Sequence, residues 1–200
     1  MSSEKPNLQN IPNKTELGQK IRDFFINKPN FSFIIADYSQ IELRVLAHLS
    51  QDSTMIEILK NKKSDIHSET ASRIFNVPIG DVTSDMRRKA KEVNFGLIYG
   101  MEAFGLSKSL DIEQKEASQL IESYFSQFPE IKGFLDNIVL KATKDSYTET
   151  LIGRKRYIRE LNSSNFQVKA AGKRIAMNAP IQGTAADIMK IAMIKVLHKI

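Results

Sequence analysis

RRKAKEVNFGLIYG, residues Arg87–Gly100, is the stretch that most constrains the fold of this chain. Ser84 ahead of it is a good N-cap, and Asp85 suits a first helical turn. The spacing of the apolar residues predicts a helix from about Asp85 to Tyr99. Four cations then crowd the N-terminal half of that helix, where the macrodipole disfavours positive charge. An anion bound there would relieve the repulsion.

One face of this predicted helix carries Arg87, Lys91 and Phe95, which are spaced four residues apart. At about 1.5 Å of rise per residue they cover roughly 12 Å, which is about the length of a triphosphate followed by a sugar and base. The same spacing also fits a solvated basic face on a helix that packs against the core. Spacing alone does not separate these two interpretations.

The composition is that of an ordinary globular protein. Of the 200 residues, 42% are hydrophobic and 26% are charged, which is enough for a hydrophobic core. The net charge of +6 and the pI of about 9.4 weakly favour polyanionic partners. The absence of cysteine excludes disulfides, thiol catalysis and zinc–thiolate sites. Because the N-terminus is polar and no apolar run is long enough for a membrane span, we expect a soluble cytoplasmic protein without a membrane partner.

The rest of the sequence predicts many helices and few strands. Residues 1–20 form an irregular lead-in, and Phe31–Ala36 (FSFIIA) is a buried strand. Thr148–Ile158 is a hairpin that turns at Gly153, and Pro180 interrupts the last helical stretch. Further helices are expected over residues 40–49, 56–60, 65–75, 112–128, 131–146, 165–178 and 185–200.

Asp37–Arg44 (DYSQIELR) follows the predicted strand. A carboxylate at the carboxyl end of a buried strand is rigidly held and exposed, which is a good way to position a metal ion. Two alternatives stay open from these residues alone. Asp37 is also suited to cap the following helix, and Glu42, one turn further on, also fits an ordinary solvated position.

Together the two segments resemble motifs of the family A DNA polymerases, and of its bacterial members above all. The resemblance continues, in the same order, through PNLQNIP at 6–12, DIH at 65–67, GRKRY at 153–157 and NAPIQGTAAD at 178–187. It implies an α/β (α+β) fold that is mainly helical, with a partial polymerase palm, a small antiparallel sheet and helical fingers. The implied division is palm over 1–50, fingers over 51–147 with the nucleotide-binding helix at 85–99, and palm again over 148–200.

The resemblance also implies a role for each matching residue around the incoming nucleotide. Asp37 matches the catalytic, metal-binding aspartate, and the backbone carbonyl of Tyr38 matches a second metal contact. The nucleotide-binding positions are, in chain order, Gln40, Glu42, His67, Arg87, Lys91, Phe95 and Tyr99.

Within this set the roles differ. Glu42 matches the steric gate that excludes a ribose 2′-hydroxyl, and Gln40 is a neighbour of that pocket. His67, Arg87 and Lys91 match the triphosphate ligands, a role that suits the bidentate guanidinium and the point charge of lysine. Phe95 matches the ring against the sugar, and Tyr99 matches the residue at the template-base position.

Five further positions match DNA contacts of the family, namely Arg154, Arg156, Arg174, Asn178 and Gln182. The last three are spaced by four and match residues that contact the minor groove of the primer–template, where such donors meet acceptors common to every base pair. Arg154 and Arg156 match cations that follow DNA phosphates. Without the resemblance these two are ordinary surface cations.

The activity implied is that of a DNA-directed DNA polymerase, which adds deoxynucleotides to a primer 3′ end on a template with two Mg²⁺ ions. That chemistry needs at least two carboxylates around the metals. The His-Asp-Glu motif that supplies the second in the family does not occur in these 200 residues. We therefore expect a fragment that is catalytically incomplete alone. The expected partners are primer–template DNA and dNTPs, with a second chain that supplies the missing palm and thumb as a further candidate.

Two alternatives remain. One is a non-catalytic nucleotide- or DNA-binding module or a split-polymerase subunit. The other is a single-subunit RNA polymerase, against which Glu42 together with Phe95 argues because this pair suits a deoxyribose pocket.

Overall fold

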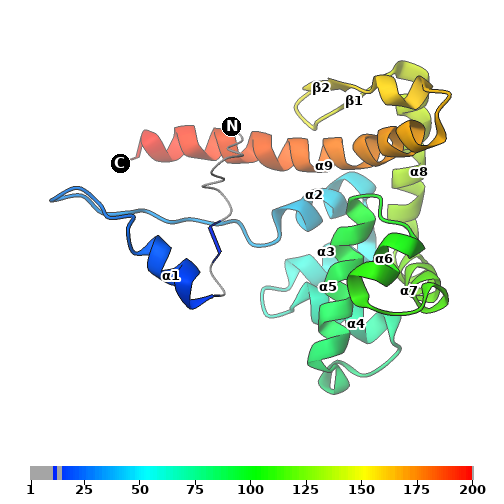
Figure 1. Cartoon of the computed structure of the whole chain (residues 1–200), viewed down its shortest axis with the longest axis horizontal. Helices are drawn as coiled ribbons and strands as arrows, with labels where there is room; N and C mark the ends of the chain where they lie inside the picture. The colour runs from blue at the N-terminus through cyan, green and yellow to red at the C-terminus, as the bar shows by residue number, and fades with distance from the viewer. Residues whose placement is uncertain (1–10, 13–14, 200) are drawn as a thin grey trace. The chain divides into compact units, whose positions relative to one another are not determined.

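The chain divides into two units, Met1–Ser39 and Gln40–Ile200. The computed structural model (Figure 1) describes residues 11–12 and 15–199 of it. The first unit contains α1 (Glu16–Arg22), whose N-cap Thr15 accepts a hydrogen bond from the Gly18 amide at 3.1 Å. The expectation of an irregular lead-in is therefore wrong over the last residues of 1–20. Residues 1–10 and 13–14 of that lead-in lie outside the described part, and most of the PNLQNIP motif lies there as well.

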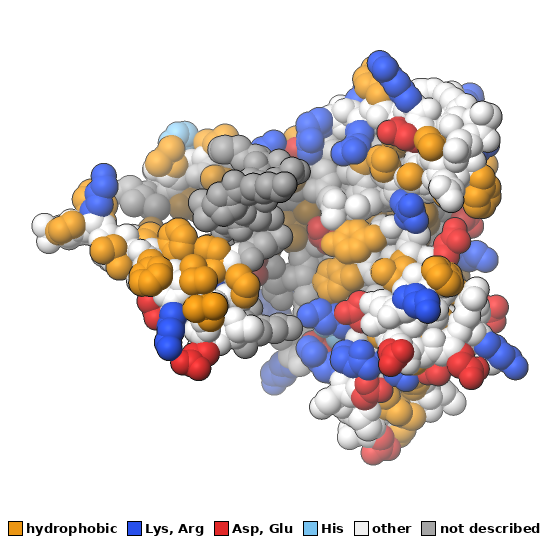
Figure 2. All heavy atoms as spheres, viewed as in Figure 1, with side chains coloured by type: hydrophobic (Ala, Val, Ile, Leu, Met, Phe, Trp, Pro, Cys, Tyr) orange, Lys and Arg blue, Asp and Glu red, His pale blue; other side chains and the backbone are white. Residues whose placement is uncertain are grey.

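The predicted buried strand Phe31–Ala36 is also wrong. These residues have no strand structure, and Ile35 is 92% exposed. A strand is stabilised by ladder hydrogen bonds to a neighbouring strand, and none of the described residues pairs with this segment. Figure 2 shows the apolar side chains of the first unit gathered at the surface over α1 and the segment that follows it.

The second unit is mainly helical, as the sequence predicts. Its helices are α2 (Ile41–Ser50), α3 (Ser53–Lys60), α4 (Ile66–Ile74), α5 (Ser84–Ile98), α6 (Ala103–Leu110), α7 (Gln114–Gln127), α8 (Pro129–Asp145) and α9 (Phe166–Leu197), with short 3₁₀ turns η2 (Ile79–Asp81) and η3 (Arg159–Asn162). Strands β1 (Tyr147–Glu149) and β2 (Lys155–Tyr157) form a two-stranded antiparallel sheet. The mainly helical fold class with one small antiparallel sheet is thus confirmed.

Local sequence explains where several of these helices begin. Asp52, Asp65 and Thr83 cap α3, α4 and α5 by accepting hydrogen bonds from backbone amides three residues on. The N-cap of α5 is Thr83 rather than the predicted Ser84, which is the first helical residue instead. The predicted hairpin is confirmed, and Gly153 at its turn has a φ of +83°, which favours glycine.

A hydrophobic core joins α2 to α8. Fully buried side chains such as Leu43, Met55, Val93, Tyr124 and Phe128 come from five different parts of this bundle. A smaller cluster, Ala142, Ile158, Leu161 and Ala176, fixes α9 against α8 and η3. The helix α6 lies between α5 and α7, where the sequence predicts no element. It ends at Leu110 and is followed by its C-cap Asp111, which has a left-handed φ of +55°.

The predicted break at Pro180 is wrong, because α9 runs through it for 32 residues. Proline removes one backbone donor, but a helix tolerates that loss where packing holds both flanks. Pro180 and Ile181 are buried, and α9 packs against α2, α8 and β1 (Figure 1). Although α9 is long, no helix within the described residues is long and apolar enough to cross a bilayer.

Candidate nucleotide and DNA interface

The cationic end of α5 is held in place by a carboxylate from α4. Arg87 forms a bidentate pair with Asp65, with Nε 2.8 Å from Oδ2 and a terminal nitrogen 3.0 Å from Oδ1. Asp65 also caps α4 through the Ser68 amide at 2.9 Å. The Arg87 guanidinium and the Ser68 donors outweigh the effect of burial and lower the pKa of Asp65 from 3.8 to about 2. Arg87 is therefore already oriented toward an anionic partner.

The other cations of α5 explain why the crowding of positive charge is tolerated. Arg88 pairs with Asp85 at 2.6 Å, and Lys89 pairs with Glu116 of α7 at 3.0 Å. Figure 2 accordingly shows red and blue side chains next to one another over this part of the second unit. Lys91 is exposed and forms no ion pair with any residue that the structure describes. Its charge remains available to a ligand.

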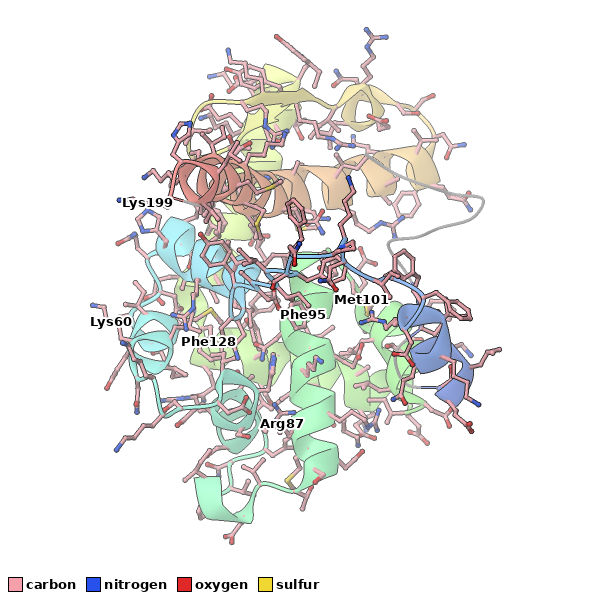
Figure 3. The ribbon with its side chains drawn as sticks, turned by 90° about the vertical axis from the view of Figure 1, so that its left-hand side faces the viewer. Lys60, Arg87, Phe95, Met101, Phe128 and Lys199 are labelled. Carbon is pink, nitrogen blue, oxygen red and sulfur yellow. The ribbon has the colours of Figure 1, made fainter. Side chains whose placement is uncertain are left out.

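His67 from α4 lies beside Phe95 of α5. The two ring centroids are 5.7 Å apart, and His67 is only 5% exposed. Burial lowers the pKa of His67, the nearby Arg87 and Lys91 lower it further, and Asp65 partly opposes them. Burial therefore favours the neutral form of the His67 ring, which lies next to the half-buried Phe95. Figure 3 shows Phe95 and Arg87 along the same helix.

The opposite end of α5 meets α2 and α9. The Tyr99 hydroxyl donates a hydrogen bond of 2.8 Å to the Glu42 carboxylate, and it also lies within hydrogen-bond reach of the Gln182 side chain. Burial and the Glu42 carboxylate raise the pKa of Tyr99. Gln40 precedes α2 as its N-cap residue, with a left-handed φ of +53°. The structure therefore brings together three predicted site residues that are far apart in sequence, namely Glu42, Tyr99 and Gln182.

The backbone after Tyr99 allows this meeting. Gly100 has a φ of +68°, and a Cβ there would lie 2.5 Å from Met177 Cε and 2.8 Å from Arg174 Cγ. The C-terminal end of α5 therefore lies directly against α9, at the residues between Arg174 and Asn178.

The predicted metal ligands lie in the first unit. Asp37 and Tyr38 are exposed and follow the extended segment 31–36, so the rigid strand end expected for Asp37 is not present. Carboxylate and carbonyl oxygens are the donor types that Mg²⁺ prefers. The described residues contain no group of three or more His, Asp or Glu side chains that could hold a metal ion.

The predicted DNA contacts lie in the hairpin, at Arg154 and Arg156, and on α9. Arg154 is engaged inside the protein, where Nε lies 2.9 Å from Asp187 Oδ1 and a terminal nitrogen donates to the Gly183 carbonyl at 3.0 Å. Asp187 is only 5% exposed, so Arg154 neutralises a buried carboxylate. Arg156, by contrast, is exposed on β2.

The three α9 positions share one face of the helix. Arg174 and Gln182 are exposed, and Asn178 is half-buried with its Oδ1 buried and unpaired. Because α9 does not break at Pro180, the four-residue spacing that sequence analysis assumes holds through Gln182.

Sequence reasoning missed Asp65, Thr70 and Asn94 as parts of this region. Asp65 belongs to the DIH motif, and its position just before a helix was the signal for a cap. Asn94 is a polar residue between Val93 and Phe95 on the buried side of α5, where an apolar residue is usual. It contacts both Thr70 and His67.

Comparison with known proteins places these features in a family. The family model described as DNA polymerase family A matches residues 1–200. The chain is 50% identical over 200 residues to DNA polymerase I of Caldicellulosiruptor bescii, and 51% identical over 195 residues to that of Geobacillus stearothermophilus. These alignments cover 100% and 97% of this chain but only 23% and 22% of the relatives, so the chain spans less than a quarter of their length.

A solved structure is similar to this chain in both fold and sequence. The POL domain of Pol1 from M. smegmatis, in complex with DNA primer-template and dNTP, superposes with a TM-score of 0.89 at 49% identity. The superposition covers 99% of this chain and 35% of that one. The chain described here belongs to DNA polymerase family A.

Proposed function

We propose that this chain forms part of the palm and the fingers of a DNA-directed DNA polymerase, and that α5 presents the incoming dNTP. The observation that carries the proposal is the line of Arg87, Lys91, Phe95 and Tyr99 along α5, with Glu42 of α2 hydrogen-bonded to its far end. This line has cations at one end, an aromatic ring in the middle and the Glu42 carboxylate at the other end. The proposed division remains palm over 1–50 and 148–200 and fingers over 51–147.

Each residue has a defined task in this proposal. Lys91 supplies an unpaired charge to the triphosphate, and Arg87 exchanges its fork with Asp65 for phosphate oxygens. Phe95 contacts the sugar, and Glu42, fixed by the Tyr99 hydroxyl, occupies the space that a ribose 2′-hydroxyl would need. Tyr99 is assigned to the template-base position, and Gln40 is assigned as a neighbour of the sugar pocket at Glu42.

DNA contacts are proposed for the exposed positions of α9 and the hairpin. The solved M. smegmatis complex contains DNA primer-template and dNTP, and we propose the same two classes of partner here. Arg174, Asn178 and Gln182 would donate to minor-groove acceptors. Arg156 is free for phosphates, whereas Arg154 acts first as the partner of Asp187.

The proposed reaction is transfer of a deoxynucleotide to a primer 3′ end. Mg²⁺, when bound, would stabilise the charge that develops on the reacting phosphate. Asp37 and the Tyr38 carbonyl are the proposed donors of this chain toward it. Because this chemistry needs at least two carboxylates around the metal ions and Asp37 is the one carboxylate proposed here, we expect this polypeptide alone to bind dNTP without extending a primer. Primer extension by the isolated chain that depends on Asp37 would contradict this expectation.

A titration of dATP against ATP tests the proposed deoxyribose pocket. We expect the chain to bind dATP more tightly than ATP, and Glu42→Ala to remove most of that preference. Equal affinity for ATP in the unmodified chain would favour the RNA polymerase alternative. A chain that binds DNA but shows no measurable affinity for dNTP would favour a non-catalytic DNA-binding module. A cytoplasmic location remains a prediction.

A further inference from the structure

A buried polar cluster holds His67 from behind. Thr70 and Asn94 are fully buried between α4 and α5, and His67 is 5% exposed. The Asn94 Nδ2 lies 3.2 Å from His67 Nδ1 and 3.2 Å from Thr70 Oγ1, while the Thr70 hydroxyl lies 3.4 Å from Asn94 Oδ1. The Nδ2 of Asn94 therefore contacts both His67 and Thr70, and its Oδ1 contacts Thr70.

The chemistry of an amide nitrogen decides which ring nitrogen carries the proton. Nδ2 of asparagine can donate hydrogen bonds and cannot accept them. His67 Nδ1, facing that donor, must present its lone pair, so the proton of the neutral ring lies on Nε2. Nε2 forms no hydrogen bond with the residues that the structure describes and is not among the fully buried side-chain atoms that lack a partner, so the small exposed fraction of His67 leaves it reachable by a ligand.

The same contact opposes a second proton on the ring. An imidazolium would direct an Nδ1–H at the Asn94 amide hydrogens inside a buried cluster, and that arrangement is costly. The charged groups that act on His67 are Asp65, which favours the cation, and Arg87 and Lys91, which disfavour it. Burial acts in the same direction as Arg87 and Lys91.

We propose that Asn94, braced by Thr70, is a positioning residue that locks His67 as a neutral Nε2–H donor to a nucleotide phosphate oxygen. The proposal rests on the proposed function in one respect, namely that the ligand is a nucleotide phosphate. It goes further in stating that His67 contributes a directed hydrogen bond and no charge. The positive charge at this end of the site then comes from Arg87 and Lys91.

The variant Asn94→Asp tests the lock by reversing its polarity. A carboxylate accepts a hydrogen bond, so it favours Nδ1–H and stabilises the imidazolium. We expect the pKa of His67 to rise by at least about one unit in this variant. The affinity of the variant for dNTP, divided by that of the unmodified chain at each pH, should rise about fivefold or more from pH 8 to pH 6. This ratio cancels the titration of the nucleotide itself.

Two controls separate the lock from a general effect on folding. Adding His67→Gln to Asn94→Asp leaves a donor that cannot titrate, and it should abolish the pH dependence of the affinity ratio. Urea denaturation of each variant reports the fold. A merely structural role of Asn94 would weaken binding equally at every pH.

Nitrogen-15 NMR of the histidine ring in the unmodified, nucleotide-free chain provides an independent measurement, with His67→Gln used to assign the signal. We expect a neutral ring protonated at Nε2 at pH 8 and at pH 7. A ring protonated at Nδ1, or an imidazolium at pH 7, would overturn the proposal even if Asn94→Asp did not fold. If the ring is as expected but the chain binds no dNTP, the lock stands and the proposed function fails.

Discussion

Replacing Asp65 with Asn removes one charge from the cationic end of α5 and leaves the cap of α4 in place. Asparagine is as good an N-cap as aspartate, so the Ser68 amide keeps an acceptor. What is lost is the attraction between the Asp65 carboxylate and the Arg87 guanidinium, whose atoms lie 2.8 and 3.0 Å apart. The variant therefore isolates one ion pair.

The pKa of Asp65 gives the size of the effect. Its lowering from 3.8 to about 2 would correspond to roughly 2.4 kcal/mol at about 1.36 kcal/mol per unit. The side chains of Arg87 and Asp65 are 47% and 35% exposed, so solvent screening reduces this figure. We expect Asp65→Asn to lower the free energy of unfolding by about 1 kcal/mol at pH 7.

The dependence on pH has a definite sign. Because the folded-state pKa of Asp65 is lower than its unfolded value, its stabilising contribution is present above about pH 4 and is lost as the pH falls toward about 2. Urea denaturation at pH 7 and at pH 3 measures both arms. The difference between the unmodified chain and the variant should shrink at pH 3. A variant as stable as the unmodified chain at pH 7, or a difference that does not change with pH, would refute the ion-pair account.

Four further substitutions and one control, Gly133→Ala, test other contacts. Gly100→Ala should lower the free energy of unfolding by at least about 1 kcal/mol, because φ is +68° and the added Cβ would meet α9. Its control Gly133→Ala, inside α8 with open space around it, should be neutral or stabilising in the same urea titration. Arg154→Gln should destabilise by about 3 kcal/mol because it leaves a buried carboxylate unpaired. Arg156→Gln should leave stability unchanged and reduce only the salt dependence of primer–template binding, measured by fluorescence anisotropy. Tyr99→Phe should cost about 1 kcal/mol through the lost hydrogen bond to the carboxylate of α2, and an unchanged urea midpoint would contradict that contact.

Local patterns predicted most of the helices of the second unit and the hairpin, because caps, apolar spacing and turn glycine act over a few residues. The strand predicted for Phe31–Ala36 is absent for a physical reason. A strand depends on a partner strand, which its own sequence does not specify. The helix break predicted at Pro180 is wrong for the opposite reason, because tertiary packing overrides a local effect there. The local effect of proline would break a helix, but burial of Pro180 and packing of α9 on both sides of it outweigh the lost hydrogen bond.

In the candidate site, too, contacts within one helix could be predicted from the sequence, whereas contacts between helices could not. The four-residue spacing of Arg87, Lys91 and Phe95 could be read along one helix, and the structure keeps it. The fork between Asp65 and Arg87 joins residues 22 apart, and the contact between His67 and Asn94 joins residues 27 apart. Such pairings between helices are set by how α4 and α5 pack, which the spacing within either helix does not contain.

The most direct test of the account is the dNTP affinity of Lys91→Ala, measured by calorimetry beside the control Lys144→Ala. Lys144 is also exposed, but it lies near the end of α8, away from α5. We expect Lys91→Ala to weaken dNTP binding by about tenfold, corresponding to about 1.4 kcal/mol, and Lys144→Ala to leave it unchanged. Equal affinities of the two variants and the unmodified chain would contradict the claim that α5 presents the triphosphate.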